Sequence, residues 1–268
     1  MDPRSVTFVL HRPQSAENVG AAARAMKNFG LSRLVVVAPP AWEGAPRGGG
    51  PGKARDDVLA RARRMARRAS DVLDAASFHG DLAAALGPAT WVCGTTSREV
   101  EGRPRLTPRE LAAEVARRSA AGEVAVVFGE ERRGLSDAEL SLCQAVCTIP
   151  TAPAYDSMNL AQAVAVIAYE LAVAPASAPT GADPAPSRRP DDGPRDRDQP
   201  ARHATLEALW ARTGALLAAT GFLNPQAPEH ILAELRRVLS RAEPTQREAE
   251  LLTAAVRTLE RIVRARRG

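Results

Sequence analysis

The chain has 268 residues, with 36 Lys and Arg against 31 Asp and Glu, a formal charge of +5 and a sequence pI near 9.7. Its three cysteines, Cys93, Cys143 and Cys147, are too few and too scattered for a disulfide framework or a zinc site, so we expect core cysteines and no metal. The sequence has no apolar leader and no run of 18 apolar residues, which favours a cytoplasmic chain without a membrane span.

Arginine far outnumbers lysine among the basic residues. Its planar guanidinium suits bidentate contact with phosphate, as in a nucleic-acid partner. Abundant Arg, Ala and Pro with scarce Lys is also typical of a GC-rich genome, so the charge alone leaves the nature of the partner open.

Two uninterrupted β-branched runs, at 34–37 and 124–128, predict strands that are buried on both faces of a sheet. Weaker apolar runs predict further strands at 6–10, 72–76, 90–93 and 145–149. Helical spacing predicts helices at 17–29, 55–69, 107–119 and 159–173. The third of these has Thr107 as its N-cap, Pro108 in its first turn and Glu110 as a capping-box residue. Strands that alternate with helices predict an α/β domain with a mostly parallel sheet.

The composition changes between residues 175 and 203, where Pro, Ala, Asp and Arg dominate and large apolar side chains are nearly absent. Such a segment cannot offset its ordering entropy and predicts a flexible linker, as the Gly/Pro-rich stretch 39–53 predicts a mobile loop. Beyond the linker, helical spacing recurs at 206–220, 231–239 and 245–264, with many arginines opposite the apolar face. We therefore expect a domain at 1–174, a linker at 175–203 and a basic, helical, RNA-binding domain at 204–268.

Three polar clusters lie where strands meet loops. The first, HRPQSAENVGAAARAMKNFG at 11–30, carries Asn18 and Arg24, and its small residues around Gly20 allow another backbone to approach. A Gly/Ala-rich helix with solvated arginines would account for this stretch as well. His11 is a possible base, although a lone histidine is more often structural.

The second cluster is VFGEERRGLSDAEL at 127–140, in which Gly129, Glu131 and Gly134 follow a buried strand before Ser136 or Asp137 caps a helix. Glycines at the carboxyl end of a strand let backbone amides approach a ligand, and α/β sheets bind ligands at that end. An ordinary strand-to-helix turn is the alternative. The pattern does not match ATP or NAD fingerprints.

The third cluster is CTIPTAPAYDSMNLAQAVAVIAYEL at 147–171. Two prolines stiffen a loop that delivers Asp156, Ser157 and Asn159 to the start of an apolar helix. Ser157 taken alone is adequately explained as a helix N-cap.

In this order, the clusters resemble the three signature motifs of the SPOUT superfamily, in its SpoU or TrmH branch of RNA ribose 2′-O-methyltransferases. The matching patterns are E-N-x-G-A-x-x-R-x-x-x-N-F-G, F-G-x-E-x-x-G-L, and I-P with S-x-N-L-A. The stretch GFLNPQAPEHILAELRRVLSRAEPTQREAELL, at 221–252, is similar to the tail of the bacterial TrmJ family, which methylates the ribose at position 32 of the tRNA anticodon loop.

The resemblance implies an α/β SPOUT knot, a mostly parallel sheet with a deep trefoil knot at its C-terminal end, followed by a small helical module. It also implies S-adenosylmethionine as cofactor, tRNA as substrate, and a homodimer whose active site is completed across the interface. Two other interpretations stay open: a SpoU-type enzyme that acts on ribosomal RNA, against which the tail argues, and a catalytically silent RNA-binding protein of the same fold.

Site residues follow from the resemblance by position. The residues expected to bind the cofactor are Thr95, Thr96, Ser97, Gly129, Glu131, Gly134, Ile149, Asp156, Ser157, Met158 and Leu160. Catalysis is expected to involve Arg24, Asn18, Glu131, Ser157 and Asn159. An arginine is a poor base because its pKa lies above ~12, so we favour a positioning role for Arg24 at the target ribose. RNA contacts are expected from Arg24, Arg236, Arg237, Arg241, Arg261 and Arg264, for which a solvated helix face is the alternative.

Overall fold

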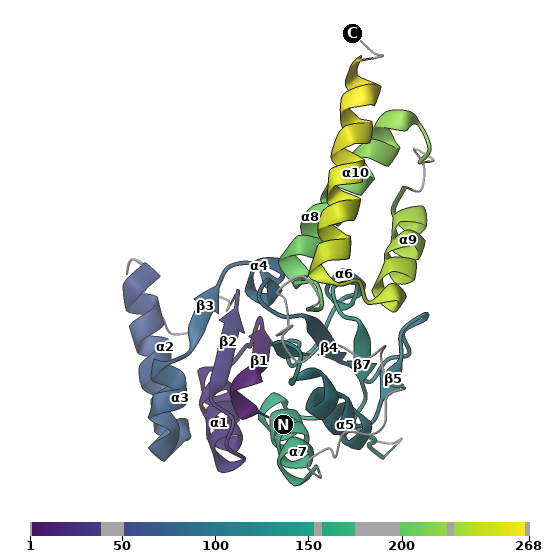
Figure 1. Ribbon diagram of the computed structural model, residues 1–268. Coiled ribbons are helices and arrows are strands. Elements are labelled where there is room, and N and C mark those ends of the chain that lie inside the picture. The colour runs from purple at the N-terminus through teal and green to yellow at the C-terminus, as the bar shows by residue number, and fades with distance from the viewer. Residues whose placement is uncertain (1, 39–50, 153–156, 175–198, 224–227, 266–268) are drawn as a thin grey trace, which may run out of the picture. The chain divides into compact units, whose positions relative to one another are not determined.

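A computed structural model describes residues 2–38, 51–152, 157–174, 199–223 and 228–265 of the chain (Figure 1). Side chains at 51–58 and 228–230 are outside this description. Two compact units are present: Met1–Ala85 with Trp91–Ala178, and Leu86–Thr90 with Pro179–Gly268. The loop expected at 39–53 and the linker expected at 175–203 lie largely outside the described residues, so the proposed domain boundaries stay a prediction.

The first unit is built on a seven-stranded sheet in which every pair of neighbouring strands is parallel, in the order β3-β2-β1-β6-β4-β7-β5. This confirms the predicted α/β class. The trefoil knot itself stays a prediction. The strands are β1 (Val6–His11), β2 (Arg33–Val37), β3 (Ser77–His79), β4 (Trp91–Thr95), β5 (Arg105–Leu106), β6 (Val124–Phe128) and β7 (Ala145–Cys147).

The helices of this unit connect and cover the strands. Three of them form a row in which α1 contacts α7 and α7 contacts α5, while α2 packs against α1 (Figure 1). The helical segments are η1 (Pro3–Ser5), α1 (Ala16–Asn28), α2 (Pro51–Ala66), η2 (Arg67–Ala69), α3 (Ser70–Asp74), α4 (Leu82–Leu86), α5 (Pro108–Arg118), α6 (Asp137–Leu140) and α7 (Leu160–Val173).

Hydrophobic burial explains the central strands. All six residues of β1 and all five of β6 are buried, as expected for strands covered on both faces. The three cysteines are free and buried, in agreement with their predicted core role. The predicted cap of α5 is also present, because Thr107 and Glu110 form a reciprocal capping box with Pro108 in the first turn.

The strand predicted at 72–76 is wrong. Residues Ser70–Asp74 form α3, and the strand β3 begins only at Ser77. The reason is visible in the burial pattern: Ala69, Val72, Leu73 and Ala76 are buried, a spacing of three and four residues that is helical.

The register of the sheet brings the ends of four strands together. Leu10 pairs with Phe128 across β1 and β6, Gly94 with Val127 across β4 and β6, and Thr95 with Cys147 across β4 and β7. The loops that follow these strands therefore start at the same edge, although they are far apart in the sequence.

The second unit contains α8 (His203–Thr220), α9 (Pro228–Ala242) and α10 (Gln246–Ala265). Helix α8 ends at Gly221, whose φ of 75° is the left-handed conformation that glycine favours. Thr245 and Glu248 cap α10 reciprocally. No helix in the described parts of either unit has the length and apolar character needed to cross a membrane.

Candidate active site

A pocket of about 390 Å³ opens at the carboxyl ends of β4, β6 and β7. Ligands of parallel α/β sheets bind at this edge, and the volume falls in the range of small-molecule sites. The lining residues are Thr95, Thr96, Ser97, Arg98, Phe128, Gly129, Glu130, Glu131, Arg132, Arg133, Gly134, Cys147, Ile149, Thr151, Ser157, Met158, Leu160 and Ala163.

Every residue that the sequence assigns to the cofactor, apart from Asp156, lines this pocket. Asp156 lies outside the described residues. The pocket also contains Arg98, which belongs to none of the three clusters, and Thr151, a position of the third cluster to which the sequence assigned no role. Contact of these residues with a cofactor stays a prediction.

The loop after β6 is a tight turn that closes on itself. Gly134 has a φ of 66° and donates its backbone N–H to the Glu130 carbonyl at 2.9 Å. A Cβ on Gly129 would lie 2.2 Å from the carbonyl carbon of Gly134, so only glycine fits there. The two glycines of this motif are therefore required by the loop itself, and they fix the wall that the loop presents to the pocket.

Three motif segments meet through hydrogen bonds at Asn18. Its side-chain amide donates to Glu131 at 2.6 Å, and its carbonyl oxygen accepts from the Asn159 amide at 3.1 Å. The other Glu131 oxygen accepts the backbone N–H of Gln14 at 2.8 Å. The Asn159 carbonyl oxygen in turn caps α7 by accepting from backbone N–H groups of the first turn. Glu131 requires a donor from Asn18 and the Asn159 amide requires an acceptor, so these two partners determine which end of the Asn18 amide is nitrogen and which is oxygen.

Asn159, and not Ser157, is the N-cap of α7. The interpretation of Ser157 as a cap is therefore wrong. Ser157 is exposed on the rim of the pocket.

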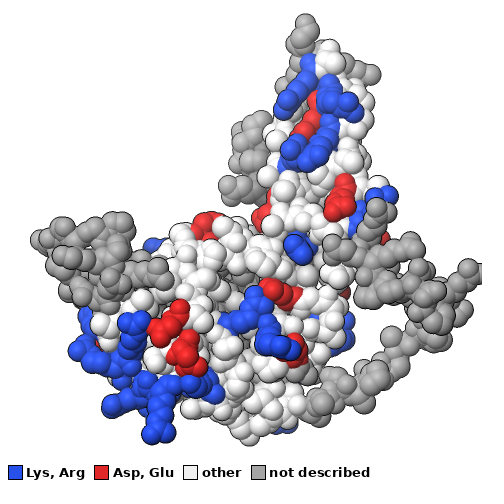
Figure 2. Space-filling view, turned by 60° about the vertical axis from the view of Figure 1, so that its left-hand side comes forward, with Lys and Arg blue, Asp and Glu red and all other residues white. Residues whose placement is uncertain are grey.

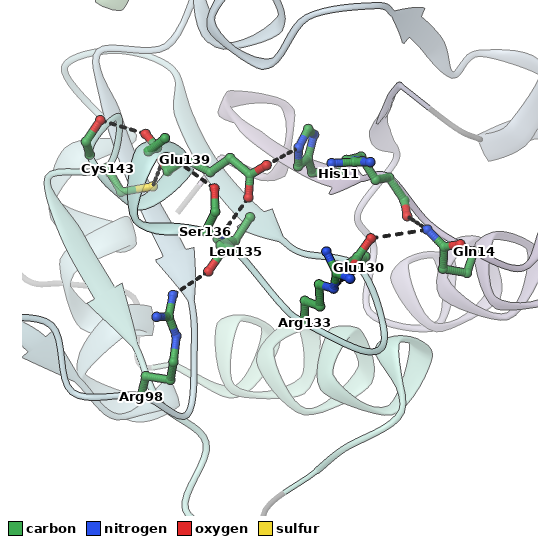
Figure 3. A network of polar contacts seen from close by, with 12 residues as sticks. His11, Gln14, Arg98, Glu130, Arg133, Leu135, Ser136, Glu139 and Cys143 are labelled. Atoms are coloured by element: carbon green, nitrogen blue, oxygen red, sulfur yellow. Dashed lines mark hydrogen bonds and ion pairs between the residues drawn. The ribbon is translucent and has the colours of Figure 1, made fainter.

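A second polar network contacts the residues that follow the loop (Figure 3). His11, at the end of β1, lies 2.7 Å from Glu139 through its Nε2, and the other Glu139 oxygen accepts the backbone N–H of Ser136. Burial raises the pKa of Glu139, but hydrogen bonds from the Ser136 backbone and from His11 outweigh it and leave the pKa below its ordinary value. Arg98 donates to the Leu135 carbonyl at 2.7 Å. His11 does not line the pocket, so its position is that of a support.

Arg24 is not among the residues that line this pocket. It is exposed on α1 and lines a different cavity, of about 570 Å³, together with Lys27, Asn28, Arg67 and Arg68. Arg24 follows Asn18 by six residues, which corresponds to roughly 240° around a helix, so the two side chains leave α1 in different directions.

The arginines predicted to contact RNA in the second unit differ in their exposure and in their ion pairs. Arg236 is half-buried and forms an ion pair with Glu207. Arg237 lies 3.7 Å from Glu234. The remaining three, Arg241, Arg261 and Arg264, are exposed.

The parallel sheet, the glycine loop and the converging motif residues are features of a SpoU-type methyltransferase, and the chain belongs to the SpoU rRNA Methylase family, which matches residues 5–169. Residues 204–268 match a second family, the C-terminal domain of the tRNA methyltransferase TrmJ. Within the SpoU family, the chain therefore belongs with the TrmJ proteins.

Proteins named TrmJ are similar to this chain over nearly its whole length. A tRNA (cytidine/uridine/adenosine-2′-O-)-methyltransferase TrmJ of Pseudomonas aeruginosa is 35% identical over 97% of this chain and 95% of its own. A tRNA (cytidine/uridine-2′-O-)-methyltransferase TrmJ of Cronobacter sakazakii is 33% identical over 96% of each chain. The crystal structure of TrmJ from Z. mobilis ZM4 superposes with a TM-score of 0.74 at 31% identity, over 95% of this chain and 98% of that one.

Methyltransferases of this family use S-adenosylmethionine. The pocket fits such a group chemically, because it combines hydroxyls and glycine backbone with the apolar side chains of Ile149, Met158 and Leu160. An adenosine with a charged amino-acid tail requires both kinds of surface. Among the described residues, no group of His, Cys, Asp or Glu could hold a metal ion.

Proposed function

We propose that the chain is an S-adenosylmethionine-dependent tRNA ribose 2′-O-methyltransferase that acts at position 32 of the anticodon loop, in the cytoplasm. The observation that carries the proposal is the hydrogen-bond chain Glu131–Asn18–Asn159, which joins the three motif segments at the rim of one pocket. The names of the TrmJ relatives and the match of residues 204–268 support tRNA over ribosomal RNA as substrate.

The cofactor is assigned to the pocket at the ends of β4, β6 and β7. When bound, S-adenosylmethionine supplies an activated methyl group, so the protein has to align the acceptor and remove a proton. Thr95, Gly129 and Ile149 would contact the cofactor from the carboxyl ends of three different strands. The Asn18 network would keep two of the walls, Glu131 and the start of α7, at a fixed separation.

Positioning the 2′-hydroxyl is assigned to Arg24. Its planar guanidinium suits a phosphate next to the target ribose, where a bidentate contact would fix the nucleotide. Ser157, on the rim of the pocket, and the exposed Asn159 beside it in sequence would orient the ribose by hydrogen bonds.

A homodimer with a shared active site would explain how Arg24 can act at the pocket although it does not line the pocket of its own chain. Within one chain, Arg24 faces a different cavity, so an Arg24 from a second chain would complete the site. The half-exposed Tyr169 and Val173 on α7 provide apolar surface for such an interface.

Subunit complementation tests this dimer. Arg24→Ala is mixed in equal amounts with a variant whose glycine loop is disabled, Gly129→Val, after partial unfolding and refolding. If sites are shared, half of the dimers are mixed and each has one intact site, so about one quarter of the sites recover. Activity that stays at the level of the separate variants would contradict sharing.

The test of the proposed function is methyl transfer from labelled S-adenosylmethionine to bulk tRNA and to ribosomal RNA. Ribose methylation of tRNA that is lost in Arg24→Ala is the expected result. Methylation of ribosomal RNA alone would move the chain to another SpoU activity, and binding of tRNA without any transfer would make it a catalytically silent protein. The basic helical domain at 204–268 is assigned to RNA binding, with exposed Arg241, Arg261 and Arg264 as phosphate contacts.

A further inference from the structure

Basic side chains gather on the first unit at a distance from the pocket described above. Figure 2 shows a group of Lys and Arg side chains over the end of α2, at the lower left of the view. The sequence there, from Arg61 to Arg68, contains five arginines and no acidic residue. Where α2 ends, Arg67 has a φ of 55°, and the chain turns into η2.

The cavity of about 570 Å³ lies within this basic group. It is lined by Arg24, Lys27 and Asn28 from α1 and by Arg67 and Arg68 from η2, together with the flanking Ala66 and Ala69, and by no acidic residue. A space lined by cations and an amide, without a carboxylate, attracts an anion.

Some of the nearby cations are already neutralised. Lys27 lies 2.7 Å from Asp71, and Arg63 lies 2.6 Å from Asp74. By contrast, the side chains of Arg24, Arg67 and Arg68 have no hydrogen bond or ion pair with any other part of the chain that the structure describes. Three guanidinium groups are thus available to an external partner.

Close packing of α1 on α2 fixes the backbone segments that carry these arginines. A Cβ on Gly20 would lie 2.0 Å from the Ala62 carbonyl oxygen, so the two helices touch through their backbones. The end of α2 is therefore fixed relative to the half of α1 that carries Arg24. The backbone positions of the three arginines are therefore set before an anion binds, so binding has to order only their side chains.

We propose that this cavity is a phosphodiester-binding site, in which Arg67 and Arg68 hold the backbone of the substrate RNA next to the nucleotide that Arg24 positions. The inference rests on the proposed function for the identity of the RNA, but not for the anion chemistry. A chain of phosphates, spaced along a strand, suits three guanidinium groups around one cavity better than a single small anion does.

The experiment measures tRNA binding as a function of salt for Arg67→Gln/Arg68→Gln, which removes both charges and keeps much of each side chain. Each lost phosphate contact reduces the slope of log K against log salt by about 1, so we expect a slope shallower by about 2 and an affinity at low salt reduced by about tenfold or more. Affinity for S-adenosylmethionine is expected to be unchanged, because neither arginine lines its pocket.

Two matched controls accompany this variant. Arg67→Lys/Arg68→Lys keeps both charges and should retain most of the slope. Arg4→Gln/Arg109→Gln removes two other exposed arginines, which already face carboxylates, and should leave the slope unchanged. If Arg67→Gln/Arg68→Gln unfolds at a lower temperature than the unaltered protein, the single variant Arg68→Gln replaces it. Its slope of log K against log salt is expected to change by about 1.

The inference would be overturned if Arg67→Gln/Arg68→Gln bound tRNA with the slope and affinity of the unaltered protein. It would also be overturned if the control Arg4→Gln/Arg109→Gln lost as much slope and affinity as that variant. Neither result decides whether the protein transfers a methyl group, because that activity is measured in a separate assay. Conversely, a protein that binds tRNA with the expected slope change but transfers no methyl group would leave this inference standing and refute the proposed function.

Discussion

Gly20→Ala tests the packing that connects the first motif to α2. The new Cβ would lie 2.0 Å from the Ala62 carbonyl oxygen and 2.8 Å from its carbonyl carbon, far inside van der Waals contact. No rotamer can relieve a clash between a Cβ and a backbone, so α2 has to move. Overpacking of this kind costs about 1–3 kcal/mol, and we expect it to exceed the gain of up to about 1 kcal/mol that alanine brings to a helix interior.

The assay is chemical and thermal unfolding of the full chain. For a unit of this size, a loss of about 1–3 kcal/mol corresponds to a melting temperature lower by roughly 2–12 °C. The matched control is Gly214→Ala in α8, whose Cβ would meet Leu232 at 3.6 Å, an ordinary contact, and which should stabilise its own unit slightly.

The same substitution has a functional consequence. If α2 moves away from α1, Arg67 and Arg68 shift relative to Arg24, so affinity for tRNA should fall while affinity for S-adenosylmethionine is unchanged. A Gly20→Ala protein as stable as the unaltered one, with the same tRNA affinity, would refute the close contact between the helices.

Two further predictions concern polar networks. Asn18→Leu removes the hydrogen bonds to Glu131 and Asn159, each worth about 0.5–3 kcal/mol, and should weaken S-adenosylmethionine binding by about tenfold in calorimetry; unchanged affinity would exclude a supporting role. Burial and then Arg236 lower the pKa of His203 to about 4, so the unfolded chain takes up a proton between pH 6.5 and 4 that the folded chain does not. Helix α8 should therefore lose about 3 kcal/mol of protection against amide exchange as pH falls through that window. Burial raises the pKa of Glu207 despite the nearby Arg236, so protonation of Glu207 stabilises the folded chain as pH falls, opposite to His203. The contribution of His203 is therefore measured as the difference in amide protection between the unaltered protein and His203→Gln. Equal pH profiles for the two would contradict it.

Local signals in the sequence predicted much of the fold. The run at 124–128 predicted a fully buried strand because a central parallel strand has no solvent-facing side. Thr107, Pro108 and Glu110 predicted the start of α5 because capping depends on neighbours in sequence.

Short elements escaped prediction. Strand β3 has three residues and β5 has two, too few to show a period of their own, and both owe their conformation to pairing with β2 and β7. The apolar run at 72–76 was assigned to a strand because its helical partner at Ala69 lies outside the run.

The site depended on contacts that no local pattern records. Asn18 reaches Glu131 because β1 and β6 are neighbours in the sheet, although more than a hundred residues separate them in sequence. The position of Arg24 was predictable in part, because a separation of six residues puts it on another side of α1 from Asn18. The cavity that it lines depends on η2, where no motif was recognised.

The most direct test of the account compares two tRNA substrates that differ in one atom. One has ribose at nucleotide 32, and the other has 2′-deoxyribose at that nucleotide alone. We expect methyl transfer to the first, none to the second, and similar affinity for both, because phosphate contacts are retained. Equal methylation of the two tRNAs would contradict it, since the acceptor oxygen would then lie elsewhere.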